Sequence, residues 1–187
     1  MKALLFHSLW GWKESLAAAS AYASDSGFDG LEMNLHHPAV KACSRNEINQ
    51  LLGSKKQQLI IEITTGGGYV PDLIEPMGKH LEAITEGLEQ ADELSPLRIN
   101  LITGSDSWCL DEQHDFLEQA ICLSRQASCP VSFETHRSRS LFNPWLIPEL
   151  LRAHPQLRLT ADLSHWCVVS ERLMTPDLKP IQAMAPH

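Results

Sequence analysis

Two short segments of the chain place carboxylates beside imidazoles and a guanidinium, each directly after an apolar run. The first is Phe133-Glu134-Thr135-His136-Arg137, and the second is Thr160-Ala161-Asp162-Leu163-Ser164-His165. Hard divalent cations prefer carboxylate oxygens, and borderline cations also accept imidazole nitrogen. Because Glu134, Asp162 and His165 combine both ligand types, the pattern predicts part of a site for Mn²⁺, Mg²⁺ or Zn²⁺.

Both acidic residues also have a purely structural interpretation. A carboxylate at the end of an apolar strand is costly to bury unless it is paired or binds a metal. Glu134 could be neutralised by Arg137 or Arg158, and Asp162 could cap a following helix through backbone N–H groups. The residue spacing alone leaves the metal-site and structural interpretations open.

The basic side chains beside these carboxylates have two interpretations as well. His136 lies two residues after Glu134, so on an extended strand both side chains would point to the same side. His165 could turn back toward Asp162 from the first turn of a helix, or be a hydrogen-bonded structural residue. Arg137 could hold a phosphate or carboxylate group, or pair with strand-end acids.

The placement of these residues depends on an alternation of apolar runs with helical periodicity. Apolar runs suited to buried strands occur near 3–9, 29–35, 59–64, 98–103, 130–135 and 157–162. Helical periodicity occurs between them, near 13–25, 44–56, 76–93, 111–127 and 144–153. Continuous apolar strands favour a parallel sheet covered on both faces. Ser44 and Glu47 predict a capping box for the second helix, and Asp111 is the predicted cap of the fourth.

Two α/β architectures fit this alternation, an open doubly wound sheet and a (β/α) barrel. A barrel draws its site from many strand ends, and polar residues end nearly every predicted strand: His7, Glu32, Asn34, Glu62, Asn100, Glu134, His136, Asp162 and His165. Gly66-Gly67-Gly68 lacks Walker and dinucleotide spacing, so it predicts a loop over the barrel mouth. The pattern therefore favours a barrel, although 187 residues hold about six strand–helix units rather than eight.

From Gly27-Phe28-Asp29-Gly30-Leu31-Glu32 onward, the chain resembles the xylose isomerase-like TIM-barrel family of sugar-phosphate isomerases and epimerases. The resemblance is most specific at Phe133-Glu134-Thr135-His136-Arg137 and at Leu159-Thr160-Ala161-Asp162-Leu163-Ser164-His165-Trp166. It implies one TIM-barrel domain over residues 1–187 that lacks the last two strand–helix units at its C-terminal side. We therefore expect this chain alone to be weakly active or inactive.

The resemblance also implies roles for individual residues. Glu134 and Asp162 would bind one divalent metal, and Glu134 and His165 would be catalytic. The remaining metal ligands would lie on a seventh and an eighth strand. Substrate-binding roles are implied for His7, Glu32, Glu62, His136, Arg137 and Trp166. The implied reaction is isomerisation or epimerisation of a sugar or sugar phosphate through an enediolate.

The composition disfavours several other functions. Fifteen basic and 23 acidic residues give a net charge of −8, which argues against a nucleic-acid partner and against a related abasic-site endonuclease. No apolar stretch approaches the ~20 residues of a membrane span, and five cysteines without metal-site spacing are typical of a cytoplasmic protein. The alternative from another class is a non-catalytic barrel remnant that persists as a homo-oligomer through its open strand edges.

Overall fold

The computed structural model describes residues 3–69 and 75–187. Its strands are β1 (Phe6–Ser8), β2 (Gly30–Asn34), β3 (Gln58–Thr64), β4 (Arg98–Ile102), β5 (Val131–Glu134) and β6 (Leu159–Thr160). Its helices are α1 (Leu16–Asp25), α2 (Pro38–Lys41), α3 (Arg45–Ser54), α4 (Met77–Asp92), α5 (Leu110–Ser124), α6 (Ile147–Ala153), α7 (Leu163–Ser170) and α8 (Lys179–Met184).

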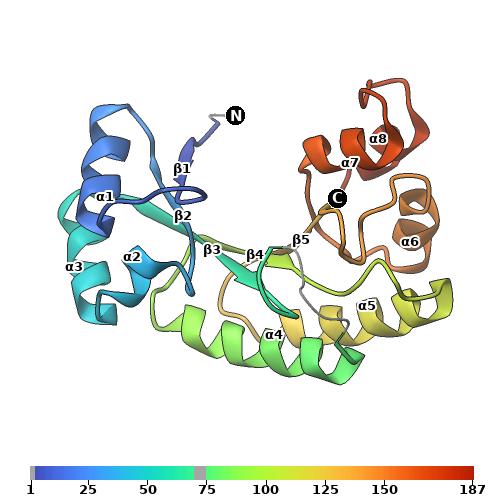
Figure 1. Ribbon diagram of the computed structural model, residues 1–187, viewed down its shortest axis with the longest axis horizontal. Coiled ribbons are helices and arrows are strands. Elements are labelled where there is room, and N and C mark those ends of the chain that lie inside the picture. Colours follow the sequence, from blue (N-terminus) through green and yellow to red (C-terminus); the bar gives the residue numbers. More distant parts are fainter. Residues whose placement is uncertain (1–2, 70–74) are drawn as a thin grey trace.

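The strands form one parallel sheet in the order β1-β2-β3-β4-β5-β6, which is also their order along the chain. A doubly wound sheet reverses its strand order at a switch point, and this sheet does not. The sheet curls into part of a barrel, and the helices cover its convex side (Figure 1). The predicted α/β barrel type is therefore confirmed, and the open doubly wound alternative is wrong.

Strand alternation gives the sheet one apolar and one polar face, because successive side chains point to opposite sides. The convex face carries buried side chains that pack against the helices, among them Leu31, Met33, Ile61, Ile99, Leu101 and Phe133. The concave face carries a polar row that follows the strand register, from Asn34 beside Glu62 to Asn100 beside Ser132. This division places polar groups at the mouth while the helices cover the core.

The sequence predicted the N-terminal cap of α3 correctly and that of α5 incorrectly. Ser44 accepts a hydrogen bond from Glu47 N, and Glu47 accepts one from Ser44 N, so the predicted capping box is confirmed. The predicted cap of α5 is wrong, because Asp111 lies inside the first turn and Cys109 is the cap residue. Glu112 accepts a hydrogen bond from Cys109 N at 2.8 Å and so replaces the capping side chain that was expected at Asp111.

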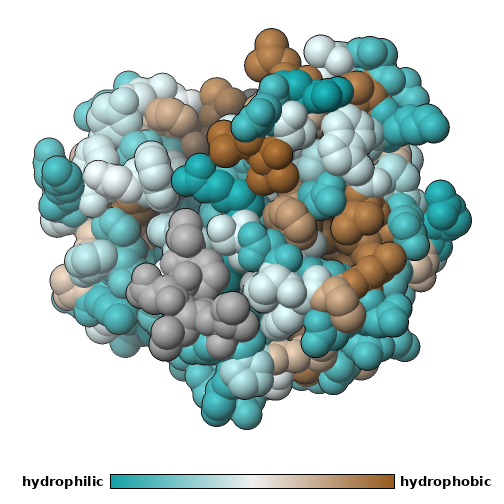
Figure 2. All heavy atoms as spheres, turned by 45° about the vertical axis from the view of Figure 1, so that its right-hand side comes forward, coloured by the Kyte–Doolittle hydropathy of each residue, from teal (hydrophilic) through white to brown (hydrophobic). Residues whose placement is uncertain are grey.

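Among the described residues, no helix is both long and apolar enough to cross a membrane. The exposed hydrophobic side chains do not form one continuous apolar face in the view of Figure 2. Hydrophobic groups there form separate patches among hydrophilic ones.

Candidate functional site

A cleft of about 620 Å³ opens at the carboxyl ends of the strands. It is lined by polar groups from β1, β2, β3, β5 and the start of α7, with Trp10 and Val168 as apolar neighbours. Seven of the nine residues that the sequence singled out line it: Glu32, Glu62, Glu134, His136, Arg137, Asp162 and His165. Curling of the sheet brings these strand ends together, as expected for a barrel mouth.

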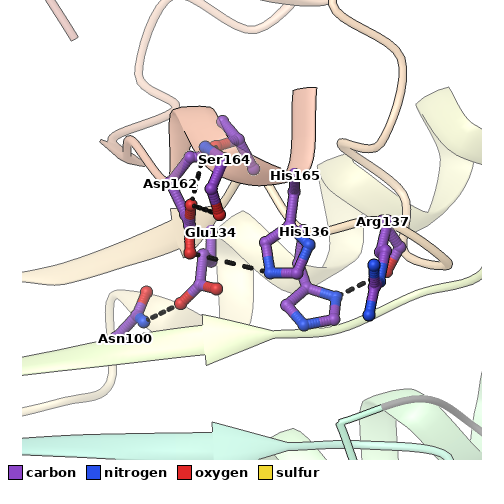
Figure 3. A network of polar contacts seen from close by, with 8 residues as sticks. Asn100, Glu134, His136, Arg137, Asp162, Ser164 and His165 are labelled. Atoms are coloured by element: carbon purple, nitrogen blue, oxygen red, sulfur yellow. Dashed lines mark hydrogen bonds and ion pairs between the residues drawn. The ribbon is translucent and has the colours of Figure 1, made fainter. Parts of the chain in front are cut away.

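Glu134 is the last residue of β5, and its side chain points into the cleft (Figure 3). Asn100 Nδ2 donates to Glu134 Oε2 at 2.5 Å, which fixes one carboxylate oxygen. Burial, reinforced by the charges of Glu62, Asp162 and Glu32 and opposed by the Asn100 hydrogen bond, raises the pKa of Glu134 to about 8. Without a cation in the cleft, this carboxyl therefore holds a proton at neutral pH.

Two histidines lie next to this carboxylate. The rings of His136 and His165 are 3.8 Å apart between centroids, at an angle of 42°. His136 Nδ1 lies 2.5 Å from the carbonyl oxygen of Arg137, and because a carbonyl only accepts, Nδ1 must carry the proton. His136 Nε2 consequently has a free lone pair. Burial lowers the pKa of His136 to about 4 and also lowers the pKa of His165, so both rings are neutral at pH 7.

Asp162 follows β6 and is the N-cap of α7. Its Oδ1 accepts from Ser164 N at 2.9 Å and from Ser164 Oγ at 2.5 Å, which satisfies the start of the helix. Its Oδ2 lies 3.6 Å from His165 Nε2 (Figure 3). Asp162 therefore makes the capping contacts of the structural interpretation with one oxygen and faces the histidine with the other.

Glu62 and Glu32 form the acidic wall on the other side of the cleft. Burial raises the pKa of Glu62, whereas hydrogen bonds from Asn34 and Tyr69 lower it. Burial and the charge of Glu62 raise the pKa of Glu32. The cleft thus gathers several carboxylates in a low-dielectric environment, and Arg137 is the one guanidinium among its described lining residues.

These donors fit a divalent cation. One ligand atom from each of Glu134, His136 and His165 lies within 4.8 Å of the other two. Zinc binds through imidazole nitrogen and carboxylate oxygen at about 2.0–2.2 Å, so the ligand atoms of one tetrahedral ion lie about 3.3–3.6 Å apart, and the three side chains would close slightly around the ion. The neutral imidazoles are already in the protonation state that binds a metal, whereas the Glu134 carboxyl would release its proton when the ion binds.

Two residues expected at the site are not brought to the cleft. His7 faces the convex side, where its ring packs against Trp12, Tyr22 and Phe28 at centroid distances of 5.1, 4.9 and 5.6 Å. Trp166 is fully buried, and its Nε1 donates to the carbonyl oxygen of Leu141 at 2.9 Å. Both side chains belong to packing layers, so the geometry does not support the expected contact of either one with a substrate.

Three polar contributors had no role assigned to them from the sequence. Asn100 orients Glu134, Ser8 lines the cleft beside Glu32, and Tyr69 reaches Glu62 from the glycine-rich loop after β3. Asn100 was among the polar strand-end residues, and strand alternation would have added that it shares a face with Glu62. Tyr69 carries no such signal, because a loop position is not fixed by periodicity.

A buried arginine supports the Tyr69 loop. Arg139 is fully buried, and its guanidinium donates to the carbonyl oxygens of Thr65, Gly68 and Tyr69. Thr65 Oγ1 also lies 2.6 Å from His80 Nδ1. The loop after β5 therefore holds the loop after β3 in place at the edge of the cleft.

Comparison with solved structures finds several that share the barrel-type fold of this chain. The probable 3-DHS dehydratase AsbF from Bacillus anthracis aligns over 97% of this chain and 70% of its own, with a TM-score of 0.66 and 18% identity. L-ribulose 3-epimerase aligns over 89% of this chain and 63% of its own, with a TM-score of 0.68 and 12% identity. The IOLI protein, solved with a bound zinc atom, aligns over 88% and 64%, with a TM-score of 0.67 and 10% identity.

These likenesses define the fold, which is the one that the sequence resemblance implied. The chain spans between 63% and 70% of the length of the three structures. No family model matches the sequence, and no curated protein matches it.

Proposed function

We propose that the chain is a divalent-metal-dependent isomerase or epimerase that acts on a sugar or a sugar phosphate. The observation that carries this proposal is the convergence of Glu134, Asp162, His136 and His165 at one cleft. The fold neighbours support the class, since one is an L-ribulose 3-epimerase and another binds zinc. The proposed domain is a single barrel-type unit over residues 1–187.

Glu134, Asp162 and His165 would hold the cation, and His136 Nε2 is a further donor within reach. When bound, the cation would polarise a carbonyl and an adjacent hydroxyl of the substrate and stabilise the enediolate. The residues present fit Zn²⁺ and Mn²⁺ better than Mg²⁺, because two imidazoles favour borderline cations over hard ones.

Glu134 is the proposed proton acceptor. Its carboxylate would take the proton from the carbon next to the substrate carbonyl and return it to the neighbouring carbon. The Asn100 hydrogen bond holds Oε2, so Oε1 is the oxygen left to face the substrate. Glu62 is a second protonatable carboxyl across the cleft, at which a proton could be exchanged on the opposite face of the substrate.

The remaining lining groups would bind and orient the sugar. Arg137 is exposed at the edge of the cleft, where it suits a substrate phosphate or carboxylate. Trp10 is 73% exposed and lines the same cleft, so its ring is available to stack on the apolar face of a sugar. Glu32 and His136 offer hydrogen bonds to hydroxyl groups.

The test is exchange of substrate C–H hydrogen with solvent deuterium in D₂O, measured by NMR. L-ribulose and its phosphate are the substrates, and Zn²⁺ is the only divalent cation added. We expect metal-dependent exchange that falls at least about 100-fold in Glu134→Gln, because the general base is removed. Glu89→Gln, at an exposed position of α4, is the matched control and should exchange as the unmodified protein does. Exchange that persists in Glu134→Gln, or that ignores a chelator, contradicts the proposal.

A further inference from the structure

A pair of histidines lies outside the cleft, between two helices that cover the convex side of the sheet. His114 lies in the first half of α5, and His154 is the C-cap residue of α6. His114 Nδ1 is 3.0 Å from His154 Nε2, and the ring centroids are 5.2 Å apart. Figure 1 draws α6 close to α5.

The backbone on both sides of the pair is fixed. His154 N donates to the carbonyl oxygen of Leu150 at 2.8 Å, and the carbonyl of His154 accepts from Leu157 N at 2.9 Å. His114 lies inside α5, a helix of 15 residues, and the side chain of the preceding residue, Gln113, is buried. The two imidazoles are therefore presented by two well-anchored elements, which is the arrangement that metal sites require.

The distance between the two nitrogens is close to the value for two ligands of one ion. Zinc–nitrogen bonds of 2.0–2.1 Å at a tetrahedral angle place two nitrogens about 3.3–3.4 Å apart. The observed 3.0 Å is a hydrogen-bond distance, so the pair needs to open by only about 0.4 Å and to tilt its rings. The ring that donates in the present hydrogen bond would move its proton to its other nitrogen, and both facing nitrogens would then offer lone pairs.

A carboxylate one turn further along α5 would complete the donor set. Glu118 follows His114 by four residues, so it lies on the same face of the helix. It is exposed, and its oxygens do not lie within 4.8 Å of both facing nitrogens, so its side chain would rotate to reach the ion. Burial, followed by His114, lowers the pKa of His154 against the effect of Glu118, which leaves the imidazole neutral and able to bind at pH 7.

We propose that His114, His154 and Glu118 form a second metal site, for zinc or another borderline divalent cation, that joins α5 to α6. Two imidazoles and one carboxylate are the ligand set of an open zinc site, with water in the remaining position. The same set binds Mg²⁺ weakly, because that ion prefers oxygen ligands. The site does not depend on the proposed isomerase function, since it shares no residue with the cleft.

Equilibrium dialysis against Zn²⁺ at pH 7.5, with zinc measured per chain, tests the proposal. We expect Glu134→Gln, which weakens the cleft site, to keep one tightly bound zinc, and His114→Gln in that background to lose it. Glutamine keeps the size and polarity of the side chain at this half-buried position, so the fold should survive. His36→Gln, at an exposed histidine elsewhere, is the matched control and should lose nothing.

Thermal unfolding gives a second readout that separates a bound ion from a structural hydrogen bond. Zinc should raise the Tm of Glu134→Gln but leave the Tm of the Glu134→Gln, His114→Gln double variant unchanged, and Glu118→Gln should weaken zinc binding about tenfold. Equal zinc content and equal Tm shifts with and without His114 would overturn the proposal and leave the pair as a hydrogen bond only. If only the cleft fails to bind zinc, the unmodified protein and Glu134→Gln will bind the same amount of zinc. The loss caused by His114→Gln will then be unchanged.

Discussion

Glu134 is a carboxyl group placed where ionisation is costly. Its neighbours are other carboxylates and neutral imidazoles, and among the described residues its side chain accepts one hydrogen bond, from the uncharged Asn100. A buried carboxylate of this kind is stable only when it is protonated or bound to a cation. The residue therefore connects the protonation of the cleft with its proposed metal binding.

The raised pKa of Glu134 predicts a specific pH dependence of stability in the metal-free protein. The pKa rises from 4.5 in the unfolded chain to about 8 in the folded one, so between these values the folded state binds more protons. The free energy of unfolding should therefore fall as pH rises from about 4.5 to 8, by on the order of 1–2 kcal/mol. Urea unfolding with a chelator present, from pH 5 to pH 8, measures it.

Glu134→Gln is the control for that measurement, because a neutral amide cannot ionise. The variant should lose most of the decline and be more stable than the unmodified chain at pH 8. A decline of equal size in both proteins would assign it to other groups and show that Glu134 is ionised in the metal-free fold.

The sequence predicted the chemistry of individual residues better than their orientation. Glu134, His136, Asp162 and His165 meet at the cleft because each follows a strand end, a position that apolar runs reveal. His7 also follows this pattern, but its side chain points to the convex face. A shift of one residue along a strand reverses the face, and apolar runs locate strand ends less precisely than that.

At the scale of elements, the start of α7 couples folding to the site. One oxygen of Asp162 caps the helix, and the other faces His165, the third residue of the same helix. The sequence left the capping and metal-binding roles as alternatives. The geometry makes them compatible, because a carboxylate has two oxygens.

Two substitutions at Asp162 separate these roles. Asparagine is as good an N-cap as aspartate, so Asp162→Asn should keep the unfolding free energy within about 0.5 kcal/mol while zinc affinity in the cleft falls at least about tenfold. Asp162→Ala should lose the cap as well, at a cost of about 1 kcal/mol. Calorimetric zinc titration and urea unfolding measure the two effects. Unchanged affinity in Asp162→Asn would leave Asp162 with the capping role alone.

The loop after β3 owes its shape to a glycine. Gly66 has a φ of +65°, and a Cβ atom there would lie 2.6 Å from Cε1 of the buried His80. Gly66→Ala should therefore destabilise the fold by about 2 kcal/mol. Gly78→Ala is the matched control, because a Cβ atom at that position of α4 meets open space, and it should stabilise by about 0.5 kcal/mol. Urea unfolding at one pH compares the two, and equal effects would show that the loop accommodates a side chain.

At the scale of the whole molecule, sequential parallel strands bring distant residues together. Glu32 and His165 are 133 positions apart in number, yet they line one cleft because every strand ends at the same edge of a curled sheet. The six strands and the five main helices were predictable from periodicity. The short helices α2 and α8 were not, because four and six residues are too few to show a helical period, and α7 was expected only as the helix that Asp162 could cap.

Metal binding at the cleft should stabilise the entire fold, since its ligands come from β5 and from the segment after β6. An ion that binds only the folded state adds about 2.7 kcal/mol when its concentration is 100 times Kd. For a chain of this size that corresponds to a rise in Tm of about 5–10 °C. Differential scanning calorimetry of His114→Gln, which isolates the cleft, measures this. An unchanged Tm at saturating zinc would mean that the cleft does not bind the ion.

The central claim is that Glu134, Asp162 and His165 hold a divalent cation at the mouth of the curled sheet. Anomalous diffraction at the zinc edge, from crystals grown with saturating Zn²⁺, tests it most directly. The predicted result is an anomalous peak in the cleft, about 2.0–2.2 Å from a carboxylate oxygen of Glu134 and from a nitrogen of His165. A cleft without anomalous density under those conditions would contradict the claim.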